Sequence, residues 1–117
     1  MKAVILAGGR GSRLSEITRS IPKPLVSING KPILFHIIDH LRSYGIKEFI
    51  ICIGYLGHLI KDYFLNYKYH NSDIKIDFAT NDVGFLKEAN LDYSVSCIDT
   101  GKKNETASRI KLVEKYL

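Results

Sequence analysis

Five stretches of the chain have hydrophobic patterns that predict strands. Residues 4–7 form a short, uniformly apolar run, which is typical of a strand buried on both faces, and residues 48–53 predict a second strand. Isoleucine and phenylalanine alternate with polar residues over 74–78, which predicts a third strand, and residues 95–98 predict a fourth. Residues 25–30 predict a short strand that ends in an Asn-Gly turn.

Helical spacing of apolar residues appears between these strands. It predicts helices over 32–44 and 56–67, the first with a proline in its opening turn and a glycine just past its end. We also expect a short helix over 12–18 and a final helix over 106–117, whereas residues 81–92 are polar and irregular and predict a loop. The residues expected to face inward from the final helix are Ile110, Val113 and Leu117.

The order of these elements indicates the fold class. Strands that alternate with helices favour right-handed crossovers and parallel pairing. We therefore expect an α/β fold: a Rossmann-like, mostly parallel sheet with helices on both faces. The 117 residues are enough for one small domain, residues 1–117, without an internal repeat or linker.

Composition excludes some classes of protein. A hydrophobic content of 45% and a charged content of 25% are ordinary for a soluble globular protein. No apolar run approaches the ~20 residues that span a bilayer, and the first residues lack a signal-peptide pattern, so we expect no membrane partner and a cytoplasmic location. Cys52 and Cys97 lie in predicted buried strands, which indicates inert core thiols rather than a disulfide or a metal pair.

The positive charge is concentrated near the beginning of the chain. The whole chain has a net charge of +5, and residues 1–31 alone account for it. The basic residues of this segment are Lys2, Arg10, Arg13, Arg19, Lys23 and Lys31, against a single acid, Glu16. Such a local cluster fits a small polyanion, such as a nucleoside triphosphate, better than a nucleic acid, which needs an extended basic track.

A glycine-rich turn follows the first predicted strand. Gly8, Gly9 and Gly11 allow the backbone to turn sharply and to approach a ligand, and successive N–H groups in such a turn can bind an anion. Neither standard phosphate motif is complete: Leu14 replaces the third glycine of G-x-G-x-x-G, and Pro32 follows Gly30-Lys31 where a P-loop needs Ser or Thr.

A tight strand-to-helix turn without a ligand is therefore the competing interpretation. Arg10, Arg13 and Lys23 favour a phosphate site, because a purely structural turn does not need three cations. Lys23 also lies between two prolines, which stiffen the loop that presents it.

A metal site on the helix over 32–44 is a further candidate. His36, Asp39 and His40 are potential ligands, but helical spacing places them on the polar flank of the apolar stripe. We interpret these three residues as solvated surface and assign no metal ligand within the chain.

The opening of the chain resembles a known family. L-A-G-G-R-G-S-R-L at residues 6–14, followed by P-K-P at 22–24, is similar to the opening motif of the sugar-phosphate nucleotidyltransferases. Softer matches continue along the whole chain, and together they most resemble the branch that transfers a cytidylyl group to glucose 1-phosphate. These matches are Gly30-Lys31-Pro32-Ile33-Leu34, Gly45-Ile46-Lys47, Phe49-Ile50-Ile51-Cys52, Gly54-Tyr55, Tyr63-Phe64 and Asp99-Thr100-Gly101.

The resemblance implies a reaction. An oxygen of glucose 1-phosphate attacks the α-phosphorus of CTP, giving CDP-glucose for surface polysaccharide and releasing pyrophosphate. Arg13 is implied to bind the β- and γ-phosphates, and Lys23 to lie between the two reacting phosphates. The implied nucleotide-binding residues are Leu6, Ala7, Gly8, Gly9, Arg10, Gly11, Ser12, Arg13, Lys23, Asn104 and Arg109.

Some positions depart from the family pattern. Ala107 and Ser108 precede Arg109 where the family has small residues, commonly glycines, and Asn104 replaces a small hydroxyl residue. Two alternatives therefore stay open: transfer of a uridylyl, thymidylyl or guanylyl group, or a non-catalytic nucleotide-binding protein.

The resemblance also implies that the chain is the N-terminal portion of an incomplete nucleotidyltransferase domain. The aspartates that hold Mg²⁺ in the complete enzyme, and the sugar-binding half, are expected beyond residue 117. The strand expected to lie beside the first strand is then absent as well, so we expect an unpaired edge there and self-association into a homo-oligomer.

Overall fold

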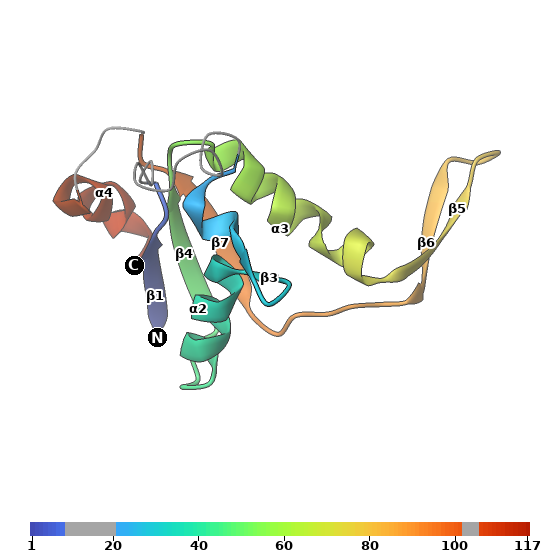
Figure 1. Ribbon diagram of the computed structural model, residues 1–117, viewed down its shortest axis with the longest axis horizontal. Coiled ribbons are helices and arrows are strands. Elements are labelled where there is room, and N and C mark those ends of the chain that lie inside the picture. The colour runs from blue at the N-terminus through green and yellow to red at the C-terminus, as the bar shows by residue number, and fades with distance from the viewer. Residues whose placement is uncertain (9–20, 102–105) are drawn as a thin grey trace.

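The computed structural model describes residues 1–8, 21–101 and 106–117 (Figure 1). Short strands and helices alternate along most of this part of the chain. In chain order they are β1 (Lys2–Leu6), the 3₁₀ helix η1 (Lys23–Leu25), β2 (Ser27–Ile28), β3 (Lys31–Pro32), α2 (Ile33–Arg42), β4 (Glu48–Ile53), α3 (Gly57–Asn71), β5 (Asp73–Asp77), β6 (Asp82–Lys87), β7 (Ser94–Asp99), α4 (Thr106–Val113) and the 3₁₀ helix η2 (Glu114–Tyr116).

A parallel sheet of three strands, in the order β1-β4-β7, forms the centre of the described structure. β4 pairs with β1 on one side, with Val4 opposite Ile50, and with β7 on the other, with Ile51 opposite Cys97. The predicted α/β class, the parallel pairing and the strand over 48–53 are confirmed. Among the described residues β1 pairs only with β4, so it lies at an edge of the sheet.

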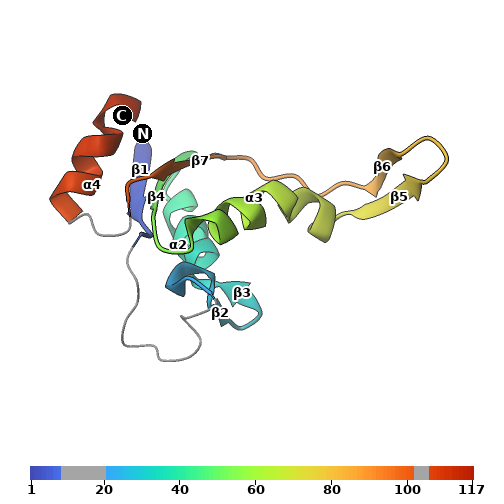
Figure 2. The same ribbon diagram turned by 90° about the horizontal axis from the view of Figure 1, so that it is seen from above.

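The alternation of β4 explains why the fold has three layers. Phe49, Ile51 and Ile53 pack on one side in a core cluster that includes Leu34 and Ile38 of α2 and Ile60 of α3. Ile50 and Cys52 pack on the other side against Val113 of α4. Because successive residues of a strand point to opposite faces, one apolar strand serves two cores. Figure 2 shows α4 on one side of the sheet, with α2 and α3 on the other, as expected for helices on both faces.

The strand over 74–78 is present but is not part of this sheet. β5 pairs antiparallel with β6, and the two strands form a separate hairpin that projects from the body beyond the end of α3 (Figures 1 and 2). The prediction of a loop over 81–92 is wrong for β6. Val83 and Phe85 share one face of this strand and Leu86 lies on the other, so its residues lack the one-sided apolar pattern of a strand that borders a core.

The predictions of helices over 32–44 and 56–67 are confirmed within a few residues at the ends, as α2 and α3. Pro32 precedes the first residue of α2, and the backbone N–H of Gly45 donates to the carbonyl of Arg42 (2.8 Å), with Gly45 at a φ of +90°. The helix predicted over 106–117 becomes α4 followed by η2. Val113 is buried as expected, but the inward positions of Ile110 and Leu117 are wrong, since these side chains are 46% and 57% exposed. Among the described side chains of α4, Val113 is the one that packs in a core cluster.

The two cysteines differ in their surroundings. Cys52 is fully buried as predicted, whereas Cys97 is half-buried, and neither forms a disulfide. Burial raises the pKa of the Cys97 thiol. None of the helices in the described residues has both the length and the apolar character of a membrane span.

Candidate functional site

The carboxyl ends of β1, β4 and β7 meet at one edge of the parallel sheet, and a glycine follows each strand within two residues. These glycines are Gly8, Gly54 and Gly101. The sheet is parallel, so residues far apart in the sequence come together at this edge. We call this group of three turns the glycine edge.

Backbone hydrogen bonds join the three turns. The N–H of Ala7 donates to the Cys52 carbonyl (2.8 Å), and the N–H of Tyr55 lies 3.4 Å from the Gly8 carbonyl that accepts it. On the other side of β4, the N–H of Thr100 donates to the Ile53 carbonyl (2.9 Å). The pairing of the parallel strands therefore continues past their ends and fixes the turns relative to one another.

Gly54 is the position where the turns approach most closely. A Cβ atom at this residue would lie 2.5 Å from the carbonyl oxygen of Gly101 and 3.1 Å from that of Gly8. Real side chains do not tolerate the shorter of these distances, so only glycine lets the three turns close in this way. Gly101 itself has a φ of +87°, a conformation that also favours glycine.

Asp99 and Thr100 provide the polar side chains of the edge. Thr100 is 1% exposed, and its hydroxyl donates to the Ile53 carbonyl (3.3 Å), so its role is to hold the turn. The carboxylate of Asp99 accepts a hydrogen bond from the N–H of Gly101 (2.9 Å) but is exposed on the surface.

Helices lie on both faces of the sheet beside β1. From β1 the chain passes to β4 by way of α2, on one face, whereas α4 lies on the opposite face against β1 and β4. The ammonium of Lys2 donates to the carbonyl of Tyr116 (2.9 Å), which places the end of η2 beside β1. In open α/β sheets ligands bind outside the carboxyl ends of the strands, which is where the glycine edge lies.

Lys23 begins the 3₁₀ helix η1, and its side chain is exposed. The N–H of Leu25 donates to the Pro22 carbonyl (2.9 Å), and Leu25 packs against the core cluster of α2 and α3. Among the described residues no carboxylate or carbonyl pairs with the Lys23 ammonium. A stiff segment therefore presents this cation without a partner in the described part of the chain.

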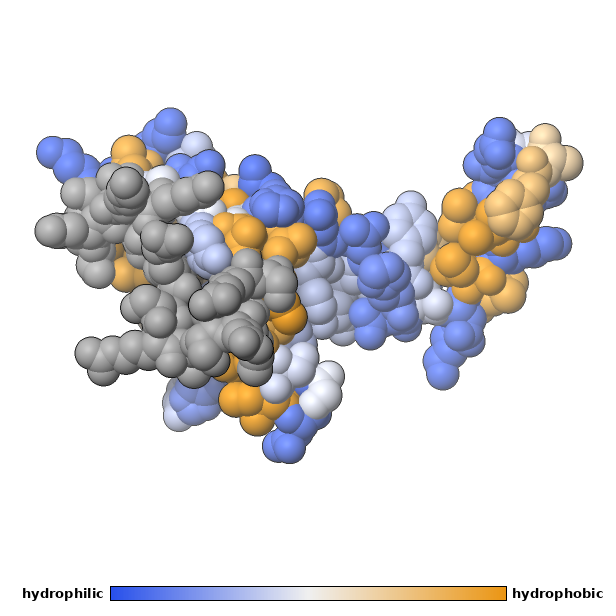
Figure 3. All heavy atoms as spheres, turned by 45° about the horizontal axis from the view of Figure 1, so that its top comes forward, coloured by the Kyte–Doolittle hydropathy of each residue, from blue (hydrophilic) through white to orange (hydrophobic). Residues whose placement is uncertain are grey.

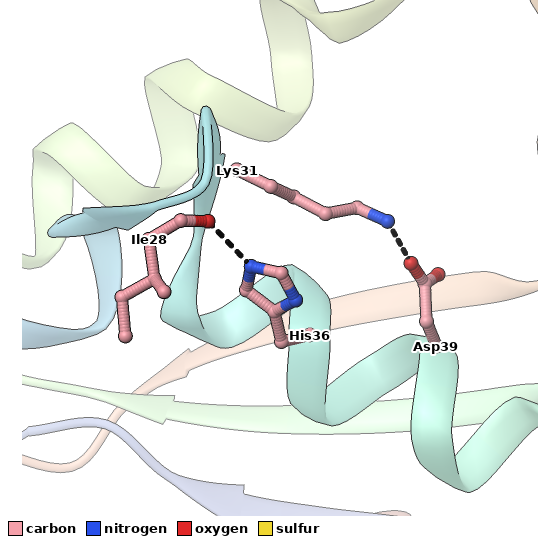
Figure 4. A network of polar contacts seen from close by, with 4 residues as sticks. All are labelled: Ile28, Lys31, His36 and Asp39. Carbon is pink, nitrogen blue, oxygen red and sulfur yellow. Dashed lines mark hydrogen bonds and ion pairs between the residues drawn. The ribbon is translucent and has the colours of Figure 1, made fainter.

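The hairpin of β2 and β3 fastens this segment to α2 (Figure 4). His36 Nε2 donates to the carbonyl of Ile28 (2.8 Å), and Lys31 forms an ion pair with Asp39. Asn29 and Gly30 have φ values of +54° and +76°, as the Asn-Gly turn predicted at this place requires. Since η1, β2 and β3 follow one another directly, these contacts also limit the movement of Lys23.

The same contacts give His36 and Asp39 structural partners. His40 packs edge-on against the ring of Tyr44 at a centroid distance of 5.3 Å. Within the described ranges, no three histidine, cysteine or acidic side chains lie close enough together to hold a metal ion.

A second polar cluster lies at the opposite end of the sheet. Asp92 accepts two hydrogen bonds from the guanidinium of Arg42, which lowers the pKa of Asp92 and raises that of Arg42. The neighbouring Tyr93 hydroxyl is buried without a hydrogen-bond partner in the described structure, and burial raises the pKa of Tyr93 to about 12. A cavity of about 400 Å³ is lined by Asp39, Arg42, Asn90, Leu91, Asp92 and Tyr93. This cavity lies at the amino end of β7, whereas the glycine edge lies at its carboxyl end, so the two are separate.

The predicted site residues divide into two groups. Leu6, Ala7 and Gly8 lie on the glycine edge, where Ala7 and Gly8 are buried, and Lys23 lies on η1. The other predicted positions lie outside the described residues: Gly9, Arg10, Gly11, Ser12, Arg13 and Asn104, together with the predicted helix over 12–18. Arg109 falls within α4, but its side chain is not among those described.

Two residues of the edge were absent from the predicted site. Gly54 and Gly101 were noted only as matches to the family. The available signal was positional, since a glycine follows within two residues of the end of each strand that pairs in parallel.

Comparison with known proteins gives consistent results. The nucleotidyl transferase family matches residues 2–117. Over all 117 residues the chain is 49% identical to the glucose-1-phosphate cytidylyltransferase of Salmonella typhimurium, and it covers 46% of that protein. The chain thus spans about half the length of this curated relative.

Two solved structures are similar over 99% of the chain. One is HddC from Yersinia pseudotuberculosis complexed with GMP-PN, with a TM-score of 0.67, 29% identity and 42% of that chain covered. The other is the CTP:phosphocholine cytidylyltransferase LicC from Streptococcus pneumoniae, with a TM-score of 0.65, 28% identity and 40% covered.

Proposed function

The chain belongs to the nucleotidyl transferase family, and from this we propose that it is the nucleotide-binding part of a glucose-1-phosphate cytidylyltransferase. The complete protein would transfer a cytidylyl group from CTP to glucose 1-phosphate, forming CDP-glucose and pyrophosphate. The choice of base and sugar rests on the relative that is 49% identical along the whole chain.

The observation that supports nucleotide binding in the structure itself is the glycine edge. The three turns leave no room for a Cβ at Gly54, so backbone and not side chains forms the surface at the ends of the strands. Backbone at the carboxyl ends of parallel strands can approach the phosphates of a nucleotide closely, because no side chain intervenes. We propose that the backbone of residues 6–12 continues this surface and binds the nucleotide.

We assign roles to the cations from the chemistry of the reaction. Attack on the α-phosphorus brings two anionic phosphates together and releases a third anion, so catalysis depends on alignment and on neutralising charge. Lys23 would lie between the reacting phosphates, and Arg13 would bind the departing pyrophosphate. Asn104 and Arg109 would contact the nucleotide from the segment after β7.

Magnesium belongs to the proposal for the complete enzyme only. The described residues hold no suitable group of three ligating side chains, although Asp99 lies on the glycine edge. These residues alone do not fit a magnesium site.

Calorimetry with CTP, GTP, UTP and dTTP tests the proposal on this chain. We expect CTP to bind most tightly and Lys23→Ala to weaken its binding. Lys47→Ala is the matched control, because Lys47 is also an exposed loop lysine but precedes β4, at the opposite end of the sheet. In a longer chain that exchanges pyrophosphate into CTP, Lys23→Ala should lower the rate on the order of 10²–10³.

Each of the other outcomes has a definite meaning. A preference for GTP would contradict cytidylyl transfer and favour the guanylyl alternative, consistent with the GMP-PN complex of HddC. Binding of a triphosphate without exchange in the longer chain would favour a non-catalytic protein. No heat with any nucleotide, from a chain that is folded by circular dichroism, would overturn the proposal.

A further inference from the structure

Asp99 carries the charge of the glycine edge. Among the described residues of the three turns (7–8, 54–57 and 99–101), no other side chain is charged. The Asp99 carboxylate is exposed and accepts a hydrogen bond from the N–H of Gly101 (2.9 Å). It forms no ion pair with a cation in the described ranges. Because a carboxylate has two oxygens with about four lone pairs, one oxygen of Asp99 is available to a ligand.

Asp99 lies on the face of the sheet that α2 and α3 cover. Val95 and Cys97 of β7 pack against the core cluster on that face, and Asp99 continues the same alternation along the strand. Leu25 of η1 packs against the same cluster, so the segment that presents Lys23 is on this face too. The segment of Lys23 and the carboxylate of Asp99 therefore lie on the same side of the sheet.

The distribution of charge gives a bound nucleotide a direction. The proposed phosphate-binding residues follow β1 in the sequence, whereas Asp99 is the last residue of β7. β4 lies between these two strands, so their ends are two strand spacings apart, which is about 10 Å. The carboxylate of Asp99 would repel a phosphate placed beside it. The uncharged base is therefore the part of the nucleotide that fits beside Asp99 when the phosphates lie at the turn after β1.

A free carboxylate oxygen can distinguish cytosine from uracil. At position 4 cytosine carries an amino group, which donates hydrogen bonds, whereas uracil carries a carbonyl oxygen, which accepts them. A carboxylate pairs with the amino group of cytosine, but opposite uracil two acceptors would face each other. The two pyrimidines have the same size, so the group at position 4 decides between them.

We propose that Asp99 selects cytosine over uracil, by accepting a hydrogen bond from the 4-amino group of cytosine on the carboxylate oxygen that Gly101 does not use. This inference rests on the proposed function, since it requires a nucleotide bound at the glycine edge. It assigns a specificity-determining role to a residue outside the set of nucleotide-binding residues predicted from the sequence.

Asp99→Asn tests the proposal, because asparagine has nearly the same shape but carries one acceptor and one donor. The N–H of Gly101 requires an acceptor, so the amide oxygen stays beside Gly101 and the amide NH₂ takes the place of the free oxygen. That position then donates, which suits the carbonyl of uracil. We expect calorimetry to show CTP binding weakened at least about tenfold, and UTP binding tighter than in wild type.

Asp77→Asn is the matched control. Asp77 is also exposed, and its carboxylate accepts a hydrogen bond from the N–H of Ala79, two residues later, at the same distance of 2.9 Å. It belongs to the β5–β6 hairpin, whose hydrophobic surface projects away from the sheet (Figure 3). The control removes the same charge from a similar turn away from the glycine edge, so the affinities for CTP and UTP should not change.

A change in the ligand tests the same hydrogen bond without any substitution. The pyrimidin-2-one analogue of CTP lacks the 4-amino group but keeps the ring, the ribose and the triphosphate. Wild type should bind this analogue about tenfold more weakly than CTP, whereas Asp99→Asn should bind it no more weakly than CTP. The four affinities form a double-mutant cycle, which separates the contact at position 4 from the general effect of removing a negative charge.

The outcomes distinguish this inference from the proposed function. If wild type binds no nucleotide, both fail. If wild type prefers CTP, but Asp99→Asn keeps the same ratio of CTP to UTP affinities, only the role of Asp99 is overturned. Equal affinity of wild type for CTP and its analogue would also overturn it. So would an equal weakening of all triphosphates that appears only with Mg²⁺ present, because Asp99 would then act as a metal ligand.

Discussion

A single absent methyl group at Gly54 is what allows three turns to meet. Gly54→Ala should lower the free energy of unfolding by about 1–3 kcal/mol, because its Cβ would meet the Gly101 carbonyl and push two backbones apart. Urea unfolding followed by circular dichroism measures the change. Gly84→Ala is the control, since a Cβ there meets nothing within 4 Å. Equal losses of stability in the two variants would contradict the close approach of the three turns at Gly54.

The hydroxyl of Tyr93 is buried and has no hydrogen-bond partner in the described structure. Tyr93→Phe should raise the unfolding free energy by about 1 kcal/mol at neutral pH, because the phenol hydroxyl no longer has to be desolvated. A loss of stability would show that the hydroxyl has a partner.

The raised pKa of Tyr93 adds a pH dependence to this comparison. Burial favours the protonated phenol in the folded state and raises its pKa from 10.0 to about 12. The contribution of this group is therefore fully present below pH 10 and is lost as the pH rises from about 10 to about 12. The stability advantage of Tyr93→Phe over wild type should grow across that window when unfolding is measured at several pH values.

At the scale of elements, the turn between β2 and β3 is the simplest to test. Gly30 has a φ of +76°, and a Cβ added there would meet no atom within 4 Å. A substitution at this residue therefore changes only how readily the backbone adopts a positive φ. Gly30→Ala should cost about 1 kcal/mol, the usual penalty for an L-residue in the left-handed region. Gly84→Ala again serves as the control, because it adds the same methyl group into open space without a positive φ.

Elements with a core on at least one side could be predicted from the sequence. β4 and α2 have strong apolar patterns because neighbouring elements cover them. The Asn29-Gly30 pair predicts the turn between β2 and β3, because both residues tolerate a positive φ. β6 could not be predicted, because it lies in a hairpin whose faces are largely exposed and its residues carry no core pattern. For the site, the sequence pointed to Gly8 and Lys23, but the role of Gly54 depends on Gly101, a residue 47 positions away whose proximity only the sheet pairing reveals.

At the scale of the whole molecule, the β5–β6 hairpin packs separately from the body, which is the three-stranded sheet with its helices. The buried residues of both core clusters lie outside β5 and β6. Replacing residues 73–88 with a short Gly-Ser turn should therefore leave the thermal unfolding midpoint of the body within a few degrees of wild type. Differential scanning calorimetry measures this midpoint. A loss of cooperative unfolding would show that this hairpin takes part in the core.

The contrast between Cys52 and Cys97 has a practical consequence for following the molecule in solution. Cys97 lines a small apolar pocket of about 240 Å³ with Lys61, Phe64, Leu65 and Val95, whereas Cys52 is sealed within the sheet. A maleimide dye should thus attach at one position, slowly because the thiol pKa is raised, without any cysteine being removed. The chain thus offers a single attachment site for a fluorophore on β7 beside α3, from which the tumbling of the body could be measured by fluorescence anisotropy.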